Sequence, residues 1–154
     1  MIDEPGILHV DAQITAAIRL RIPRAQMQSV MGPAIGEVMG ALAAQGVQPG
    51  GAVFSRHFRM DPELFDFEVG VPVGRLVHES GRVRVSLLPA AKVARTIYRG
   101  PYEGLGEAWG EFEEWIAAEG HECAAGLWEC YVAGPESGAD ASQWRTELTR
   151  PLVR

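Results

Sequence analysis

Two glutamates, Glu68 and Glu147, lie in alternating segments where a carboxylate can do chemistry. Glu147 alternates with Thr146 and Leu148, so in a β-strand it lies opposite the more apolar face. If the strand face that carries Glu147 is exposed to solvent, Glu147 is an ordinary solvated residue. If that face borders a cleft, loss of water raises the carboxyl pKa, and the group favours a cation or activates a water as a general base. Glu68 alternates similarly with Phe67 and could line the opposite side of the same cleft.

Aromatic residues, which attract desolvated cations through their ring faces, are concentrated between Tyr98 and Tyr131. This stretch holds three of the four tryptophans and all three tyrosines. By the period of a strand, Tyr131 and Glu129 lie on one face and Trp128 on the other. If Glu147 and Tyr131 share a cleft, as hairpin pairing permits, then Trp128 reaches it from a strand end or belongs to the core.

The other aromatic residues of this stretch have two interpretations. Trp109 and Trp115 lie in a segment of helical periodicity, where an aromatic stripe ordinarily packs against a sheet. Contact with a ligand is the alternative. Tyr98 and Tyr102 flank a turn, and they either contribute contacts at the rim of a site or pack on the surface.

Common catalytic and cofactor motifs are missing. The segment 104–110 differs from the phosphate-binding pattern GxGxxG by one additional residue, and its third glycine falls within a helix. The four histidines have no paired metal-ligand spacing, and neither CxxC nor HExxH occurs. No serine lies in a GxSxG turn. We therefore predict no metal and no cofactor, and a hydrolase would have to use a carboxylate-activated water.

Two amphipathic helices are predicted, one in each half of the chain. The first begins near Pro33 and ends at Gly46, and the second covers 103–119 and ends at Gly120. Strand-like segments flank both helices. They cover 8–22 before the first helix and, in the second half, 83–98, 127–133 and 144–152.

The two halves match at a constant offset. Gly32 corresponds to Gly106 and Gly46 to Gly120, an offset of 74 residues that also pairs Phe54 with Trp128. Each half then has the order β-α-β-β. The sequence predicts an internal duplication, with repeat one at about 8–73 and repeat two at about 82–152.

These elements predict one α+β domain over 1–154, built from two pseudo-twofold-related β-α-β-β repeats with a cleft between them. Neither half alone has enough apolar residues for much of a core. A cleft at such a junction is a common place for a small molecule to bind.

Composition argues against several classes of protein. A net charge of −6 and a single lysine disfavour the phosphate backbone of a nucleic acid as a direct partner. No apolar run approaches the roughly 18 residues of a membrane span. The acidic N-terminus does not resemble a signal peptide, so we expect a bacterial cytoplasmic protein in which Cys123 and Cys130 stay reduced.

The second half also resembles a known family. The segments 98–105, 127–131, 146–148 and 151–152 are similar to those of the stand-alone form of the GyrI-like small-molecule-binding family. Domains of this family also occur as effector-binding modules of AraC-type and MerR-type transcription activators. The resemblance covers essentially the whole chain. Unlike those activators, this sequence shows no helix-turn-helix, so we expect no direct control of transcription.

The resemblance implies a cleft lined by aromatic residues around a buried glutamate, which accepts cationic, aromatic or otherwise lipophilic compounds, as in multidrug binding. Carried onto this sequence, the cleft glutamate is Glu147. Tyr131, Trp128 and Trp109 are its expected aromatic neighbours, and Glu68 is a further expected ligand-binding residue.

Three functions follow as hypotheses. The preferred one is binding of a small lipophilic or cationic aromatic molecule between the repeats. The second is hydrolysis of strained electrophiles such as cyclopropane-bearing toxins, an activity reported for some stand-alone members. Glu147 would then activate water, and Tyr131 would donate a proton or hydrogen bond. The third is an inhibitory interaction with DNA gyrase. The identity of the ligand and the oligomeric state stay open.

Overall fold

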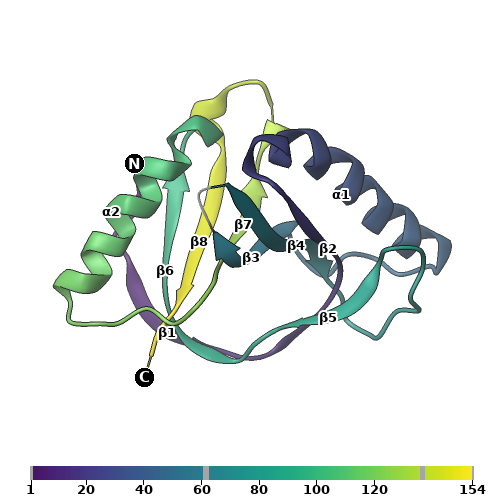
Figure 1. Cartoon of the computed structure of the whole chain (residues 1–154), viewed down its shortest axis with the longest axis horizontal. Coiled ribbons are helices and arrows are strands. Elements are labelled where there is room, and N and C mark those ends of the chain that lie inside the picture. Colours follow the sequence, from purple (N-terminus) through teal and green to yellow (C-terminus); the bar gives the residue numbers. More distant parts are fainter. Residues whose placement is uncertain (1, 61–62, 136–137, 154) are drawn as a thin grey trace. The chain divides into compact units, whose positions relative to one another are not determined.

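The computed structural model describes residues 2–60, 63–135 and 138–153. The chain forms two compact units, one of Met1–Val10 with Ala91–Arg154 and one of Asp11–Ala90. Each unit contains antiparallel strands and one α-helix (Figure 1), which confirms the predicted α+β class. None of the helices in the described residues is long and apolar enough to cross a membrane.

The unit that contains both chain ends has its strands in the order β1-β6-β8-β7. Its helix ends where the sequence predicts, because Gly120 adopts a φ of +80°, which a glycine takes without strain. The elements of this unit are β1 (Gly6–Val10), β6 (Ala91–Arg99), η2 (Tyr102–Gly104), α2 (Leu105–Ala118), β7 (Leu127–Ala133), η4 (Ala141–Gln143) and β8 (Arg145–Pro151).

The core of this unit lies between α2 and one face of its sheet. The buried side of α2 consists of Ala108, Trp109, Phe112 and Ile116, the stripe expected from helical periodicity. It packs on side chains that the strand register places on a common face: Ala94 and Tyr98 of β6, Leu127 of β7 and Leu148 of β8.

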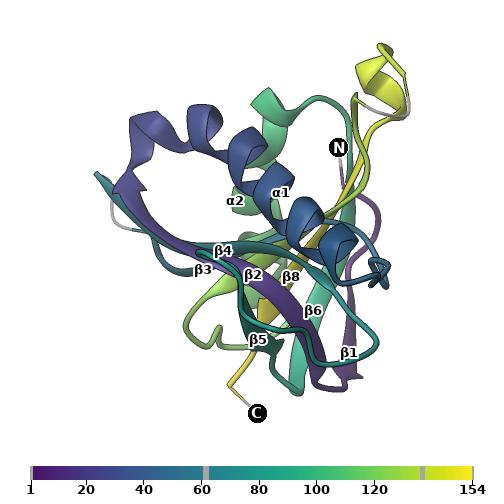
Figure 2. The ribbon, with the colours of Figure 1, turned by 90° about the vertical axis from the view of Figure 1, so that its right-hand side faces the viewer.

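The other unit has its strands in the order β5-β2-β4-β3. Figure 2 shows α1 lying over β2 and β4, where Ala34, Val38 and Leu42 belong to one apolar cluster with Ile18 and Phe67. The elements of this unit are β2 (Gln13–Pro23), η1 (Arg24–Gln26), α1 (Met27–Ala44), β3 (Phe54–Met60), β4 (Leu64–Pro72) and β5 (Arg84–Leu88).

Helix α1 corrects one prediction, because Pro33 lies inside the helix and not in its first turn. Proline removes one intrahelical hydrogen bond, which disfavours an interior position. Apolar packing outweighs this cost, since Met27, Val30 and Met31 of the preceding turns pack against the core cluster. The end of α1 is as predicted, with Gly46 at a φ of +68°.

The two units share one connectivity, which the sequence predicts as β-α-β-β. In each unit the strand before the helix (β2 or β6) pairs with the second strand after it (β4 or β8), and that strand also pairs with the first strand after the helix (β3 or β7). Each unit also has an edge strand outside this pattern: β1 pairs with β6, and β5 pairs with β2. Strand β5 lies within the predicted repeat two but belongs to the unit of Asp11–Ala90, so the single strand predicted over 83–98 is wrong: it forms two strands, β5 and β6, in different units. The internal duplication and the cleft between the repeats stay predictions.

Candidate functional site

A buried carboxyl group, that of Glu129 on β7, lies at the centre of the candidate site. The residue is 8% exposed, and both of its carboxyl oxygens accept hydrogen bonds from aromatic side chains. Trp109 Nε1 donates to Oε2 at 2.6 Å, and Tyr131 Oη donates to Oε1 at 2.8 Å. Both donors are neutral, so the charge of an ionised Glu129 is not compensated by either of them.

The strand register explains why these three side chains meet. Glu129 lies opposite Leu148, so it points to the sheet face that α2 covers. Trp109 reaches it from the buried side of α2. Tyr131 follows two residues later on the same strand, and therefore on the same face, just before a bulge in the β7–β8 ladder.

Further aromatic rings extend the site beyond Tyr131. The ring of Tyr102, on η2, meets that of Tyr131 edge to face with 5.9 Å between centroids. The indole of Trp144 lies 5.1 Å from the Tyr102 ring. On the other side, Trp109 is 5.7 Å from Phe112. We refer to Trp109, Tyr102, Tyr131 and Trp144 as the aromatic shell of Glu129.

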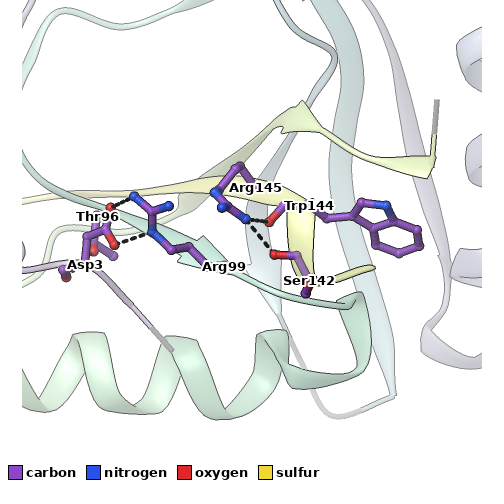
Figure 3. A network of polar contacts seen from close by, with 6 residues as sticks. All are labelled: Asp3, Thr96, Arg99, Ser142, Trp144 and Arg145. Atoms are coloured by element: carbon purple, nitrogen blue, oxygen red, sulfur yellow. Dashed lines mark hydrogen bonds and ion pairs between the residues drawn. The ribbon is translucent and has the colours of Figure 1, made fainter. Parts of the chain in front are cut away.

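Local hydrogen bonds hold Trp144 in this shell. Its Nε1 donates to the Gly138 carbonyl at 3.1 Å. The Nη1 atom of Arg145 donates to the carbonyls of Ser142 and Trp144 at 2.9 and 2.8 Å, as Figure 3 shows. The carboxylate of Asp140 accepts from the Ser142 amide at 3.1 Å and caps η4. The turn before β8 is therefore fixed from both sides of Trp144.

The neighbouring end of β6 is tied to the N-terminal segment. Arg99 donates to both oxygens of Asp3, at 2.6 and 2.9 Å, and Thr96 Oγ1 donates to the Asp3 carbonyl at 2.7 Å (Figure 3). The hydrogen bonds from Arg99 lower the pKa of the Asp3 carboxyl. Tyr98, expected at the rim or surface, is instead a core residue, 4% exposed.

Burial raises the pKa of the Glu129 carboxyl, and the hydrogen bonds from Trp109 and Tyr131 oppose that rise. No charged side chain of the described residues contributes to this shift. Such a group has three chemical uses: it can neutralise a cationic ligand, donate a hydrogen bond when protonated, or exchange a proton with a bound water. The sequence pattern placed Glu129 beside Tyr131 but gave no sign that this face is buried.

Glu147, the glutamate favoured from the sequence, lies on the opposite face of the same sheet. It pairs with Cys130 and Ile97, its side chain is 26% exposed, and Arg95 Nε lies 3.5 Å from its Oε1 atom. Tyr131 pairs with Thr146, so the hairpin register that would bring Tyr131 and Glu147 to one face does not occur. The structure thus separates the two residues expected to act together.

The remaining predicted residues lie in different settings. Trp109 contacts Glu129, as described. Trp128 pairs with Thr149 and shares the face of Glu147, where it is 3% exposed. Glu68 belongs to the other unit, where Ser86 Oγ lies 2.9 and 2.8 Å from its two carboxyl oxygens.

No group of three or more His, Cys, Asp or Glu residues in the described part of the chain could hold a metal ion. The absence of a metal or other cofactor stays a prediction.

Comparison with known proteins agrees with the resemblance in the second half. A model of the GyrI-like small molecule binding domain matches residues 3–153. No curated protein sequence matches the chain significantly. The crystal structure of the EcmrR C-terminal domain has a TM-score of 0.85 and 20% identity, and the match covers 98% of each chain. In the EcmrR–DNA complex in EcmrR-RPo, solved by cryo-EM, the TM-score and identity are the same, but 98% of this chain spans only 57% of the EcmrR chain.

Two more distant structures share the fold. SAV2435 bound to tetraphenylphosphonium has a TM-score of 0.66 and 13% identity, with 98% of this chain and 94% of that chain covered. A hydrolase from Listeria innocua has a TM-score of 0.66 and 12% identity, with 97% and 92% covered. At these identities the likeness concerns the fold alone. The family model, in contrast, covers nearly every residue, and the chain belongs to the GyrI-like small molecule binding domain family.

Proposed function

We propose that this protein binds a small lipophilic cation, with Glu129 as its counter-charge and the aromatic shell as its lining. The observation that carries this proposal is the setting of Glu129: an 8% exposed carboxyl group that receives hydrogen bonds from Trp109 and Tyr131. A desolvated carboxylate strongly favours a cation, and each desolvated ring face adds about 1–2 kcal/mol of attraction. The tetraphenylphosphonium-bound neighbour supports this choice of ligand class.

The proposal replaces Glu147 by Glu129 as the ligand's carboxylate and keeps Tyr131 and Trp109 as ligand-binding residues. Arg95 Nε lies 3.5 Å from a carboxyl oxygen of Glu147. Glu147 therefore already has a positively charged partner and has less need of a cationic ligand. Ligand contacts by Trp128 and Glu68 remain hypotheses from the sequence, with no further support from their settings.

Isothermal titration with tetraphenylphosphonium chloride tests this assignment. Glu129→Gln keeps the size of the side chain and can still accept from Trp109, but it removes the charge. We expect Glu129→Gln to weaken the binding free energy by about 2 kcal/mol, which is a roughly 30-fold lower affinity. Glu147→Gln is the matched control on the same sheet and should bind as the wild type does. Reduced affinity in the control, with Glu129→Gln unaffected, would restore Glu147 as the ligand's partner.

Hydrolysis of a strained electrophile is a second candidate function, favoured by the 2.8 Å contact between the Glu129 carboxyl and the Tyr131 hydroxyl. Glu129 would remove a proton from water as the oxygen adds to a cyclopropane carbon. Tyr131 would donate a proton to the carbon that takes the electrons of the broken C–C bond, and then recover one from Glu129. The Listeria innocua hydrolase with the same fold is consistent with this chemistry.

Product analysis separates the two functions. Incubation with a cyclopropane-bearing electrophile should yield, for an enzyme, a product heavier by one water in the wild type and not in Glu129→Gln. Recovery of unchanged compound with the wild type argues for binding alone. Interaction with DNA gyrase stays a prediction from the family resemblance.

A further inference from the structure

The carboxyl group of Glu129 differs from other carboxylates of this chain in what surrounds it. Several other carboxylates lie against arginines: Asp3 with Arg99, Glu37 with Arg82, Asp66 with Arg19, Glu79 with Arg84, Glu113 with Arg150 and Glu147 with Arg95. Glu129 is more deeply buried than most of these, and within the described residues only the neutral donors of Trp109 and Tyr131 bond to it.

Among the described residues, no positively charged side chain of the elements packed around Glu129 forms an ion pair with it. On the same sheet face, β6 contributes Tyr98, whose hydroxyl donates to the Pro101 carbonyl at 2.7 Å. Strand β8 contributes Arg150, which pairs with Glu113 of α2. The 3-10 helix η2 carries Tyr102 near Tyr131 and the exposed Glu103, and the other carboxylates of α2, Glu107, Glu111 and Glu114, are exposed.

A carboxylate that is buried without a counter-charge is costly, so it takes up either a proton or a cation. We propose that ligand uptake at this site is an exchange, in which a lipophilic cation enters and the Glu129 carboxyl gives up its proton. This inference rests on the proposed function of Glu129 and adds a second participant, the proton. The O–H bond of the carboxyl breaks, both electrons stay on the oxygen, and the proton passes to solvent.

The geometry identifies the oxygen that holds the proton. An indole N–H can only donate, so Oε2, which receives the bond from Trp109 Nε1, must accept in either state. The proton therefore belongs on Oε1, 2.8 Å from the Tyr131 hydroxyl. A phenol accepts from the protonated acid and donates to the carboxylate, so Tyr131 serves both states.

Linkage fixes the direction of the pH effect. Above the pKa of the empty site, Glu129 is already ionised and the affinity for a cation does not depend on pH. Below that pKa, binding must remove a proton, and the affinity falls tenfold for each unit of pH. Burial of Glu129 raises this pKa, so the fall begins at a higher pH than an exposed glutamate would give.

Titration calorimetry with tetraphenylphosphonium chloride from pH 5 to 8.5, in pairs of buffers with different ionisation enthalpies, counts the protons released. We expect release to rise toward one proton per ligand as the pH falls, together with the tenfold slope. Triphenylphosphine oxide, a neutral probe of similar shape, should show neither. Tyr131→Phe removes the donor that favours the carboxylate, so it should move the pH dependence to higher pH while the overall fold is retained.

The outcomes distinguish the exchange from the proposed function. Binding that Glu129→Gln weakens, but that releases no proton and has no pH slope, overturns the exchange and leaves the proposed function standing. Binding that Glu129→Gln does not change, or no binding at any pH, overturns both.

Discussion

Gly104, in the turn that carries Tyr102 into the aromatic shell, has no room for a side chain. A methyl group at this position would lie 2.1 Å from Tyr98 Oη and 3.1 Å from Tyr98 Cζ. The Tyr98 ring cannot easily yield, because it is 4% exposed and its hydroxyl donates to the Pro101 carbonyl at 2.7 Å. Gly104→Ala should therefore displace a buried ring and break its hydrogen bond.

The two costs can be added roughly. Overpacking a core costs about 1–3 kcal/mol, and a lost hydrogen bond about 1 kcal/mol. Replacing glycine by alanine stabilises the folded state by about 0.5 kcal/mol, because alanine restricts the unfolded chain. We expect Gly104→Ala to lower the free energy of unfolding by about 1.5–3.5 kcal/mol. Gly110→Ala is the matched control, since Gly110 is an exposed residue within α2 where an added methyl would meet nothing within 4 Å, and it should gain up to about 1 kcal/mol.

Urea unfolding of both variants, with and without Tyr98→Phe, measures the effect and its cause. Removing the hydroxyl deletes the atom at 2.1 Å, so Gly104→Ala should cost at least about 1 kcal/mol less in the Tyr98→Phe background. A Gly104→Ala protein as stable as Gly110→Ala would refute this account of the turn. Equal costs in both backgrounds would show that the hydroxyl is not the obstacle.

Two other substitutions test the unit of Asp11–Ala90. Gly70→Ala would place a methyl 2.2 Å from the Ala16 carbonyl and 2.8 Å from Ala17 Cα, both backbone atoms of the paired strand β2, so circular dichroism should show a protein that is unfolded or has a far lower Tm. Burial lowers the pKa of His57 from 6.5 to about 4, so the unfolded chain takes up the proton first and the stability present above pH 6.5 falls as the pH drops toward 4. The full loss is about 3 kcal/mol, and about 2 kcal/mol of it falls between pH 6.5 and 4.5. Urea unfolding at these two pH values should show that loss in the wild type and much less in His57→Phe. An equal loss in both proteins would assign it to other groups.

Much of the fold was predictable because it depends on local signals. The glycines at positions 46 and 120 end their helices through a backbone conformation that few other residues adopt. The stripe of Trp109, Phe112 and Ile116 identifies the buried face of α2 from spacing alone. Pro33 was misplaced because packing by the apolar residues before it outweighs a local preference.

The site was harder to predict because it depends on the register between strands. Both Glu129 and Glu147 alternate with apolar neighbours, and a shift of one residue exchanges the faces of a strand. A short hairpin turn would have fixed this register, but residues 134–144 separate β7 from β8, and a bulge follows Tyr131. The sequence predicted Trp109 and Tyr131 as neighbours of Glu147, whereas in the structure both donate hydrogen bonds to Glu129. A ligand-binding role for any of these residues stays a proposal.

The pairing of β1 with β6 also affects the order in which the protein can fold during its synthesis on the ribosome. The unit of Asp11–Ala90 is one continuous segment, so it can fold as soon as it has been synthesised. Strand β1 is made first, yet its partner Ala91–Arg99 emerges only after that whole unit. The unit that carries Glu129 is thus the last to be completed, and a prematurely ended chain would lack the site proposed above.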